Sequence, residues 1–389
     1  MSTSQDYEFR GWMGLDKDCI EKGTLEEQVF TPKPFGDSDV DIKITHCGIC
    51  GSDVHALSSG RRQTNYPICV GHEITGTAVK VGKDVKNIKV GDRVGVGAQS
   101  CSCMKPSCSQ CNPHIQVFVI GQHCNPDLTH TLFSGTTKNE QYCPEMILTY
   151  GDTYPDGSRS MGGYGDYVRI HEHFTFKIPE TLPSEMAAPM FCAGITMYSP
   201  LKRNGVGPGK TVGIIGIGGL GHFGLLWAKA LGADKVVAIS RTLSKSEDAH
   251  NLGADAFIAT EEDPMWAEKN ANSVDLIVCT SYAPNMPISK YLQLIKPHGT
   301  YIQVGIPDDE IPAFRMMPMM KKGVTIGGSL IGSPAEISEM LELAASKEVR
   351  PWVNPWPMSE VNGALAAFYR GEPRYRIVLV NEKHAKHYM

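Results

Sequence analysis

Two residues with metal-binding side chains, Cys50 and His72, lie about twenty positions apart in distinctive local sequences. The first stands in Cys47-Gly-Ile-Cys50-Gly-Ser-Asp-Val-His55 and the second in Val70-Gly-His72-Glu73. A thiolate and a neutral imidazole are a ligand pair that Zn²⁺ prefers. A structural zinc normally has four protein ligands, whereas a catalytic zinc keeps one position for water or substrate. Because no second Cys-His pair follows closely, the pattern predicts an open, catalytic zinc whose third ligand comes from elsewhere in the chain.

Cysteines are concentrated around this pair. Seven of the twelve cysteines lie between Cys47 and Cys111. The first ten residues lack the basic and apolar regions of a secretory signal, so a cytoplasmic location is expected. In that compartment clustered cysteines indicate metal binding rather than disulfides. The alternative, a small buried hydrophobic residue, is expected for Cys19, Cys69 and Cys279.

A glycine-rich turn offers a second kind of chemistry. The stretch Gly216-Ile-Gly218-Gly219-Leu220-Gly221 follows an expected strand, Thr211–Ile215, and opens an expected helix, Gly219–Leu231. Glycines let the backbone turn tightly and approach a pyrophosphate that faces the helix N-terminus. A plain glycine-rich turn is the alternative. The flanking strand and helix, with a second strand at Lys235–Ile239, favour a dinucleotide site.

The residues after that second strand indicate which dinucleotide binds. An Asp or Glu there would accept a hydrogen bond from the ribose 2′-hydroxyl and select NAD. The chain instead reads Ile239-Ser240-Arg241-Thr-Leu-Ser-Lys245. Ser240, Arg241 and Lys245 offer a hydroxyl and two cations to a 2′-phosphate, which predicts NADP. A solvated basic turn is the alternative.

The sequence shows two kinds of periodicity, which predict the elements that position these residues. Up to about residue 185, turns separate short strands in an all-β, barrel-like pattern. From Lys210 onward strands alternate with helices, which predicts a parallel sheet with right-handed crossovers. A capping-box pattern with an early proline opens a further helix at Ser333–Glu336. The strands expected in addition to those above are Val40–Ile44, Glu73–Val81, Arg93–Val96, Val274–Val278, Thr300–Val304 and Val324–Ile326.

The chain of 389 residues is too long for a single growing core, so we expect more than one domain. The expected fold is α/β: a barrel-like, mainly β catalytic domain at 1–185 and a doubly wound parallel (Rossmann) nucleotide-binding domain at 186–340. Residues 341–389 are expected to return to the catalytic domain. The net charge of −5 argues against a nucleic-acid partner, and no apolar run is long enough to span a bilayer.

The combined motifs resemble those of the zinc-dependent medium-chain alcohol dehydrogenases, specifically the cinnamyl alcohol dehydrogenase branch. The resemblance extends from Gly11-Trp12 to Leu379, nearly the whole chain. It implies a GroES-like catalytic domain and an enzyme in which zinc is a Lewis acid and NADPH supplies the hydride. The residues that carry it are Cys50-Gly-Ser-Asp-Val-His55, Gly71-His72-Glu73, Cys192-Ala-Gly-Ile-Thr196, Tyr198-Ser-Pro-Leu201, Gly216–Gly221 and Arg374-Tyr-Arg376.

This resemblance implies roles for individual residues near the catalytic zinc. Cys50, His72 and Cys192 would be its ligands, with Glu73 as an occasional fourth. Asp53 would orient the ring of His72 from behind.

The resemblance also implies a proton path and further cofactor contacts. Ser52 would pass the proton of the bound alcohol through the cofactor ribose towards His55 at the surface. Thr196 and the glycine loop, Gly216, Gly218, Gly219, Leu220 and Gly221, would contact the cofactor.

A second, structural zinc is implied by the run Cys101-Ser-Cys103-Met-Lys-Pro-Ser-Cys108-Ser-Gln-Cys111. Relatives carry a four-cysteine lobe here, in which about seven residues separate the third and fourth ligands. In this chain Cys143 follows a seven-residue spacer, Thr136–Tyr142, so Asn112–Gly135 is interpreted as a 24-residue insertion into a lobe at 101–143. Two origins of this insertion are open. It is either an exposed loop, since added loop length costs little closure entropy, or the product of a retained intron in the gene model. The expected ligands are Cys103, Cys108, Cys111 and Cys143, with Cys101 competing for the first position, and the expected content is two Zn²⁺ per chain.

The function indicated is the interconversion of primary alcohols and aldehydes, aromatic or aliphatic, favouring aldehyde reduction. A polyol dehydrogenase of the same superfamily and a non-catalytic zinc-binding interaction protein are the alternatives. An open zinc and a dinucleotide site speak against the second alternative, because a docking module needs neither. Relatives are commonly dimers that pair through their nucleotide-binding sheets, so a homodimer is expected.

Overall fold

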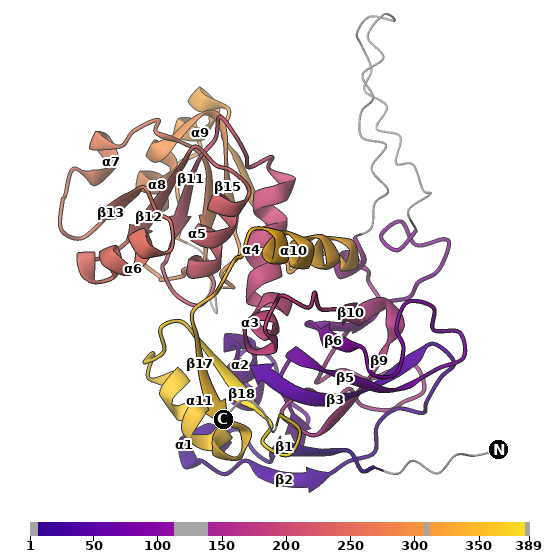
Figure 1. Cartoon of the computed structure of the whole chain (residues 1–389). Helices are drawn as coiled ribbons and strands as arrows, with labels where there is room; N and C mark the ends of the chain where they lie inside the picture. Colours follow the sequence, from indigo (N-terminus) through magenta and orange to yellow (C-terminus); the bar gives the residue numbers. More distant parts are fainter. Residues whose placement is uncertain (1–6, 113–138, 307–309, 311, 386–389) are drawn as a thin grey trace, which may run out of the picture.

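Residues 7–112, 139–306, 310 and 312–385 are described by a computed structural model. They form two sheet-based regions, and the C-terminal segment of the chain joins the N-terminal one (Figure 1). The predicted insertion lies almost wholly outside the described residues. None of the described helices is both long and apolar enough to cross a membrane.

The N-terminal region is built on a seven-stranded sheet. Six strands have the order β10-β6-β5-β3-β18-β17, and β9 also pairs with β3. The three strands expected from the sequence here are confirmed, and β3 extends further than predicted. Their bounds are β3 (Asp39–Gly48), β5 (Glu73–Val81), β6 (Arg93–Val96), β9 (Tyr167–His171), β10 (Phe176–Lys177), β17 (Val353–Pro357) and β18 (Arg376–Val380).

Small sheets and short helices complete this region. A three-stranded sheet has the order β2-β1-β4, and β7 pairs with β8 beside the cysteine-rich segment. The all-β pattern did not predict the helices among them, because each is shorter than the window in which helical periodicity is visible. The elements are β1 (Arg10–Gly14), β2 (Glu26–Val29), β4 (Ile68–Cys69), β7 (Gln99–Cys101), β8 (Ile147–Leu148), α1 (Cys19–Lys22), α2 (Gly51–Leu57) and α3 (Ser184–Ala187).

The nucleotide-binding region is a six-stranded, wholly parallel sheet of order β13-β12-β11-β14-β15-β16. This order reverses between β11 and β14, the place where such sheets bind ligands. The predicted strands are confirmed within a few residues, except that β15 begins five residues earlier. The strands are β11 (Thr211–Ile215), β12 (Lys235–Ser240), β13 (Ala256–Ala259), β14 (Val274–Cys279), β15 (Ile295–Gln303) and β16 (Thr325–Gly328).

Helices cover both faces of this sheet. Val236 and Ala238 of β12 pack into one core, and the alternate residues Val237 and Ile239 pack into the other. Ser333 caps α10 as predicted, because its side chain accepts from the Glu336 backbone while the Glu336 carboxylate accepts from the Ser333 backbone. The helices are α4 (Ala193–Arg203), α5 (Gly221–Ala230), α6 (Ser246–Asn251), α7 (Trp266–Lys269), α8 (Ile288–Leu294), α9 (Met317–Lys322) and α10 (Pro334–Ser346).

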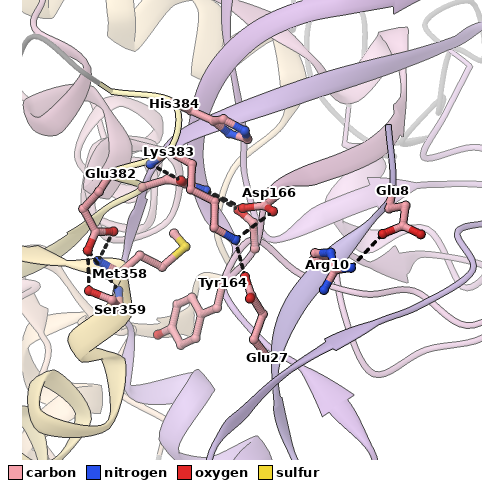
Figure 2. A network of polar contacts seen from close by, with 12 residues as sticks. Glu8, Arg10, Glu27, Tyr164, Asp166, Met358, Ser359, Glu382, Lys383 and His384 are labelled. Atoms are coloured by element: carbon pink, nitrogen blue, oxygen red, sulfur yellow. Dashed lines mark hydrogen bonds and ion pairs between the residues drawn. The ribbon is translucent and has the colours of Figure 1, made fainter. Parts of the chain in front are cut away.

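The C-terminal segment returns to the first sheet. Strand β18 pairs with β3, and helix α11 (Val361–Tyr369), which the proline-rich pattern did not predict, packs against α1. Beyond β18, Lys383 forms ion pairs with Glu27 of β2 and, at 3.1 Å, with Asp166, while Glu382 binds Ser359 (Figure 2). The 3-10 helices along the chain are η1 (Glu140–Tyr142), η2 (Glu172–Phe174), η3 (Ala188–Phe191), η4 (Leu243–Lys245) and η5 (Met358–Glu360).

Candidate active site and metal centres

A single cleft of about 1370 Å³ connects the two regions. Its walls come from both sheets, so residues more than 300 positions apart in the sequence share it. Cofactor-sized ligands commonly bind in such a cleft. The sequence-predicted residues that line it are Cys50, Ser52, His55, His72, Cys192, Thr196, Gly216, Gly218, Gly219, Leu220, Ser240, Arg241 and Lys245.

Four predicted metal ligands meet at one end of the cleft. Ligand atoms of Cys50, His72, Glu73 and Cys192 all lie within 4.8 Å of one another. The Cys50 and Cys192 Sγ atoms are 3.8 Å apart, and His72 Nε2 is 3.1 Å from Cys192 Sγ. Two thiolates bound tetrahedrally at about 2.3 Å from zinc would be separated by about 3.8 Å. The spacing of the two sulfur atoms therefore fits Zn²⁺.

The fold brings these ligands together from three segments. Cys50 lies between β3 and α2, and Glu73 begins β5, where it is paired with Gly48 of β3. Cys192 immediately precedes α4 of the nucleotide-binding region. Strand pairing thus fixes two segments, and the contact between the two regions supplies the third.

Glu73 is buried, and only one of its two carboxylate oxygens has a hydrogen-bond partner among the described residues. Its Oε1 accepts a hydrogen bond from Arg376 Nη2 at 2.5 Å, whereas its Oε2 has no hydrogen-bond partner among the described residues. Burial raises the pKa of Glu73 to about 8, against the opposing effect of the Arg376 charge. A buried carboxylate oxygen without a partner, beside two thiols and an imidazole, fits a cation.

The two thiols of this group influence each other. The hydrogen bond from Cys192, followed by the nearby His72, holds the pKa of Cys50 well below its ordinary value. Metal binding requires deprotonated thiols, so this arrangement is prepared for a cation.

Asp53 lies behind His72, where the sequence predicted an orienting carboxylate. Its Oδ1 is 3.4 Å from His72 Nδ1, and both side chains are buried. Tyr164, which the sequence interpretation missed, donates a hydrogen bond to Asp53, and Tyr150, also missed, lies near enough to interact with Asp53 electrostatically. The pair Gly162-Gly163 before Tyr164 was the available signal, since consecutive glycines often mark a close backbone approach.

Ser52 and His55 lie on α2, three positions apart, and both face the cleft. Side chains at this spacing share one helix face. Ser52 is adjacent in sequence to the Cys50 segment, and His55 lies one turn further along α2.

The glycine loop follows β11 and leads into α5, as predicted. Gly216 has a φ of +86°, and a Cβ there would lie 1.9 Å from Ser281 Oγ. A Cβ on Gly221 would lie 1.9 Å from the Gly216 carbonyl oxygen, which makes close packing its function. A Cβ on Gly218 would meet no atom within 4 Å, so this backbone faces the open cleft. The loop therefore leaves room for a pyrophosphate.

The basic turn after β12 lines the same cleft. Lys245 donates to the Ile217 carbonyl at 2.6 Å, and its ammonium lies over the Tyr375 ring, 5.6 Å from the ring centroid. Burial lowers the pKa of Lys245, and the neighbouring Arg374 adds to this effect. Tyr375 in turn donates to Asp248 at 2.6 Å. The sequence interpretation missed Asp248, because its distance from the turn becomes short only in the folded α6.

The second predicted metal group is also assembled. Ligand atoms of Cys103, Cys108, Cys111 and Cys143 lie within 4.8 Å of one another, and the Sγ atoms of Cys103 and Cys111 are 3.7 Å apart. Backbone donors, first that of Gln110, lower the pKa of Cys108 to about 7. The competing candidate, Cys101, is outside this group and points its Sγ at the Ser102 carbonyl at 3.4 Å. Four sulfur ligands fit a closed structural zinc.

Comparison with known proteins agrees with this geometry. Residues 36–180 match the alcohol dehydrogenase GroES-like domain, and residues 219–346 match the zinc-binding dehydrogenase domain. NADP-dependent alcohol dehydrogenase 6 of Saccharomyces cerevisiae is 42% identical over 90% of this chain and 91% of that protein. Cinnamyl alcohol dehydrogenase 2 of Rauvolfia serpentina is 39% identical over 95% of this chain and 94% of that protein.

Solved structures show the same likeness. A cinnamyl alcohol dehydrogenase from Sorghum bicolor superposes with a TM-score of 0.82 at 33% identity, covering 96% of this chain and 98% of the other. CAD from Helicobacter pylori, complexed with NADP(H), has a TM-score of 0.80 at 29% identity and covers 98% of this chain and 99% of the other. With its zinc-type ligand groups and its nucleotide sheet, this chain belongs to the zinc-binding alcohol dehydrogenases and is an oxidoreductase of that family.

Proposed function

We propose that the protein interconverts primary alcohols and aldehydes, aromatic or aliphatic, with NADP as cofactor, and that it favours aldehyde reduction. One observation carries this proposal: a single cleft is lined by Cys50, His72 and Cys192 and by the dinucleotide loop. An open metal position and a nicotinamide can meet only in such a shared space. The names of the relatives from yeast and Rauvolfia support the same reaction class.

In this proposal Cys50, His72 and Cys192 hold a catalytic Zn²⁺, which when bound supplies the Lewis acidity that polarises the substrate oxygen. Glu73 is an occasional fourth ligand, and Arg376 neutralises it when it is withdrawn. Asp53 orients His72. Ligands from both regions of the fold are needed, so the centre is complete only when the cleft is formed.

Ser52 and His55 are proposed to carry the proton. Ser52 lines the cleft next to the ligand segment and would exchange a proton with the substrate oxygen. His55 would exchange that proton with solvent, and a ribose hydroxyl of the bound cofactor would supply the link between the two residues. Both side chains are partly exposed, which suits a path that must end in solvent.

Ser240, Arg241 and Lys245 are proposed to bind the 2′-phosphate of NADP, and Thr196 with the glycine loop to bind the rest of the cofactor. The position that would carry an NAD-selecting carboxylate is Ser240, at the end of β12. Arg241→Asp is expected to lower the preference for NADPH over NADH roughly 10- to 100-fold, because a charge-assisted contact contributes about 1.5–3 kcal/mol. An unchanged preference would show that this turn does not bind the phosphate.

The direct test of the reaction is NADPH oxidation with cinnamaldehyde, with and without a chelator. We expect turnover that the chelator abolishes and added Zn²⁺ restores. Mannitol with NADP is the matched assay for the polyol alternative, which is favoured by a 38% identical relative named as a probable mannitol dehydrogenase. Absence of chelator-sensitive aldehyde reduction would refute the proposal.

We also assign the four-cysteine group to a second, structural zinc.

We propose further that two chains pair through β16. Strand β16 is an edge of the parallel sheet, and the nearby Met316, Met317 and Met320 are exposed. Unpaired edge strands and apolar surface both favour association. Light scattering during size-exclusion chromatography should give the mass of a dimer, and metal analysis should give two zinc ions per chain.

A further inference from the structure

The Asp53 carboxylate gathers donors from both ligand-bearing segments of the proposed catalytic zinc. Its Oδ2 accepts from the backbone N–H of Cys50 at 2.8 Å, and its Oδ1 accepts from that of Gly71 at 3.1 Å. The His72 ring faces the same Oδ1. Asp53 is fully buried, so water cannot replace these donors. Its position therefore determines how the Cys50 and His72 segments are set against each other.

Tyr164 donates a further hydrogen bond to this carboxylate, from its hydroxyl to Oδ2 at 2.9 Å, and it too is fully buried. The backbone that carries Tyr164 is joined to the His72 segment. Gly163 N donates to the Gly71 carbonyl at 2.8 Å, and Tyr164 N donates to the Val70 carbonyl at 3.0 Å. A Cβ on Gly71 would lie 2.5 Å from the Tyr164 ring, so glycine before the ligand histidine makes this approach possible.

The opposite side of the Tyr164 segment is anchored by the C-terminal tail. Asp166 forms an ion pair with Lys383 at 3.1 Å, and the Asn381 amide donates to Asp166 Oδ1 at 3.0 Å. In Figure 2 Tyr164 lies beside this polar network and not within it. The backbone of the tyrosine is thus held between the tail and the His72 segment, and its buried hydroxyl is held at Asp53 by their hydrogen bond.

Tyr150 reaches Asp53 from the cleft. Its side chain lies near enough to Asp53 to interact with it electrostatically, and its ring stacks on the His72 ring with centroids 5.4 Å apart and an interplanar angle of 27°. Tyr150 also lines the cleft, whereas Tyr164 does not. Tyr164 therefore holds the carboxylate from the protein interior, and Tyr150 packs on the imidazole from the substrate side.

We propose that Tyr164 and Tyr150 are positioning residues of the catalytic zinc, which fix Asp53 and through it the His72 ligand. The inference rests on the proposed zinc site at Cys50, His72 and Cys192. Groups that orient a metal ligand from behind typically change metal affinity 10- to 100-fold when they are altered. The phenol hydroxyls, and not the rings, are the parts expected to matter.

The test uses Tyr164→Phe and Tyr150→Phe in the full-length zinc-loaded protein, with Tyr301→Phe as the matched control. Tyr301 is a buried tyrosine of β15 whose hydroxyl donates to Gln303 Oε1 at 3.0 Å, away from the cleft. Zinc release to a chromogenic chelator is followed in time. The release phase that disappears in Cys192→Ser identifies the catalytic zinc.

We expect release of the catalytic zinc to be about ten-fold faster or more in Tyr164→Phe. The other zinc and the Tyr301→Phe control should release at the wild-type rate. With Co²⁺ in the catalytic site, the visible absorption bands should shift in Tyr164→Phe and Tyr150→Phe but not in the control. A merely structural tyrosine would leave that spectrum unchanged.

Equal release rates and equal cobalt spectra in wild type, Tyr164→Phe and Tyr150→Phe would overturn the inference. If Tyr164→Phe does not fold, Tyr150→Phe decides the question alone, because its side chain borders open space. A wild-type protein without a zinc that depends on Cys192 would instead refute the proposed function. The two failures are therefore distinguishable.

Discussion

The two cysteine groups of this protein use similar atoms in opposite ways. The Cys50 group takes its candidate metal ligands from three distant segments and mixes sulfur, nitrogen and oxygen. The group around Cys103 uses sulfur alone, and three of its four candidate ligands lie within nine residues. The first group is mostly buried at the end of a cleft, whereas three members of the second are partly exposed.

This difference separates a site that the fold must build from one that the chain builds locally. Short loops between ligands cost little closure entropy, so the Cys103 group needs only one distant residue, Cys143. The Cys50 group instead depends on strand pairing and on contact between two regions. In exchange it leaves a position open to the cleft, which a closed four-sulfur site does not.

The largest effect expected from this comparison is that of Cys192→Ser. Without the ligand from the nucleotide-binding region, the catalytic zinc should be lost and aldehyde reduction should fall at least about 10³-fold, since a Lewis acid contributes several kcal/mol. Metal analysis should still find the zinc of the Cys103 group. Loss of both zinc ions would show that the two groups are not independent.

Cys143→Ser should act on the other group. We expect one zinc to be lost. The free energy of unfolding should also fall by more than about 1 kcal/mol, the average cost of a single substitution, because metal binding to such a site is coupled to folding. Chemical denaturation followed by fluorescence measures this change. The refolded variant should keep its catalytic zinc and much of its turnover; complete inactivation would mean that the lobe supports the cleft.

The comparison also shows what the sequence could predict. Cysteines marked by a local cluster, such as Cys103, Cys108 and Cys111, do lie together in the structure, and strands marked by apolar runs, such as Thr211–Ile215, were predicted correctly. Cys192 and Cys143 needed the family resemblance, because no local spacing joins them to their partners. Tyr150 and Asp248 were missed, since their significance depends on distances that only the folded chain creates.

Acid should affect the region around the cleft through a buried histidine. Burial, followed by the charge of Arg376, lowers the pKa of His222 to about 3, against an ordinary value of 6.5. Between these two values the unfolded chain binds a proton that the folded chain does not. Stability from this residue is therefore complete above pH 6.5 and is lost as the pH falls towards 3.

At pH 5 this loss amounts to about 2 kcal/mol. His222→Asn retains a donor for the Gly219 carbonyl, which His222 Nδ1 contacts at 3.0 Å, and removes the titration. Urea unfolding at pH 7 and pH 5 should show a smaller decrease for the variant than for the wild type. Equal decreases would place the acid sensitivity elsewhere, for example at the buried His46.

The smallest effect is expected from deletion of Asn112–Gly135. If these 24 residues are an insertion, the deletion joins Cys111 to the seven-residue spacer before Cys143 and restores the spacing typical of relatives. Zinc content should stay at two per chain, and turnover should be unchanged, because the ligands of both groups lie outside the deleted segment. A fall to one zinc would show that the segment takes part in the four-cysteine group, and the contrast between a locally built and a fold-built site would then no longer hold.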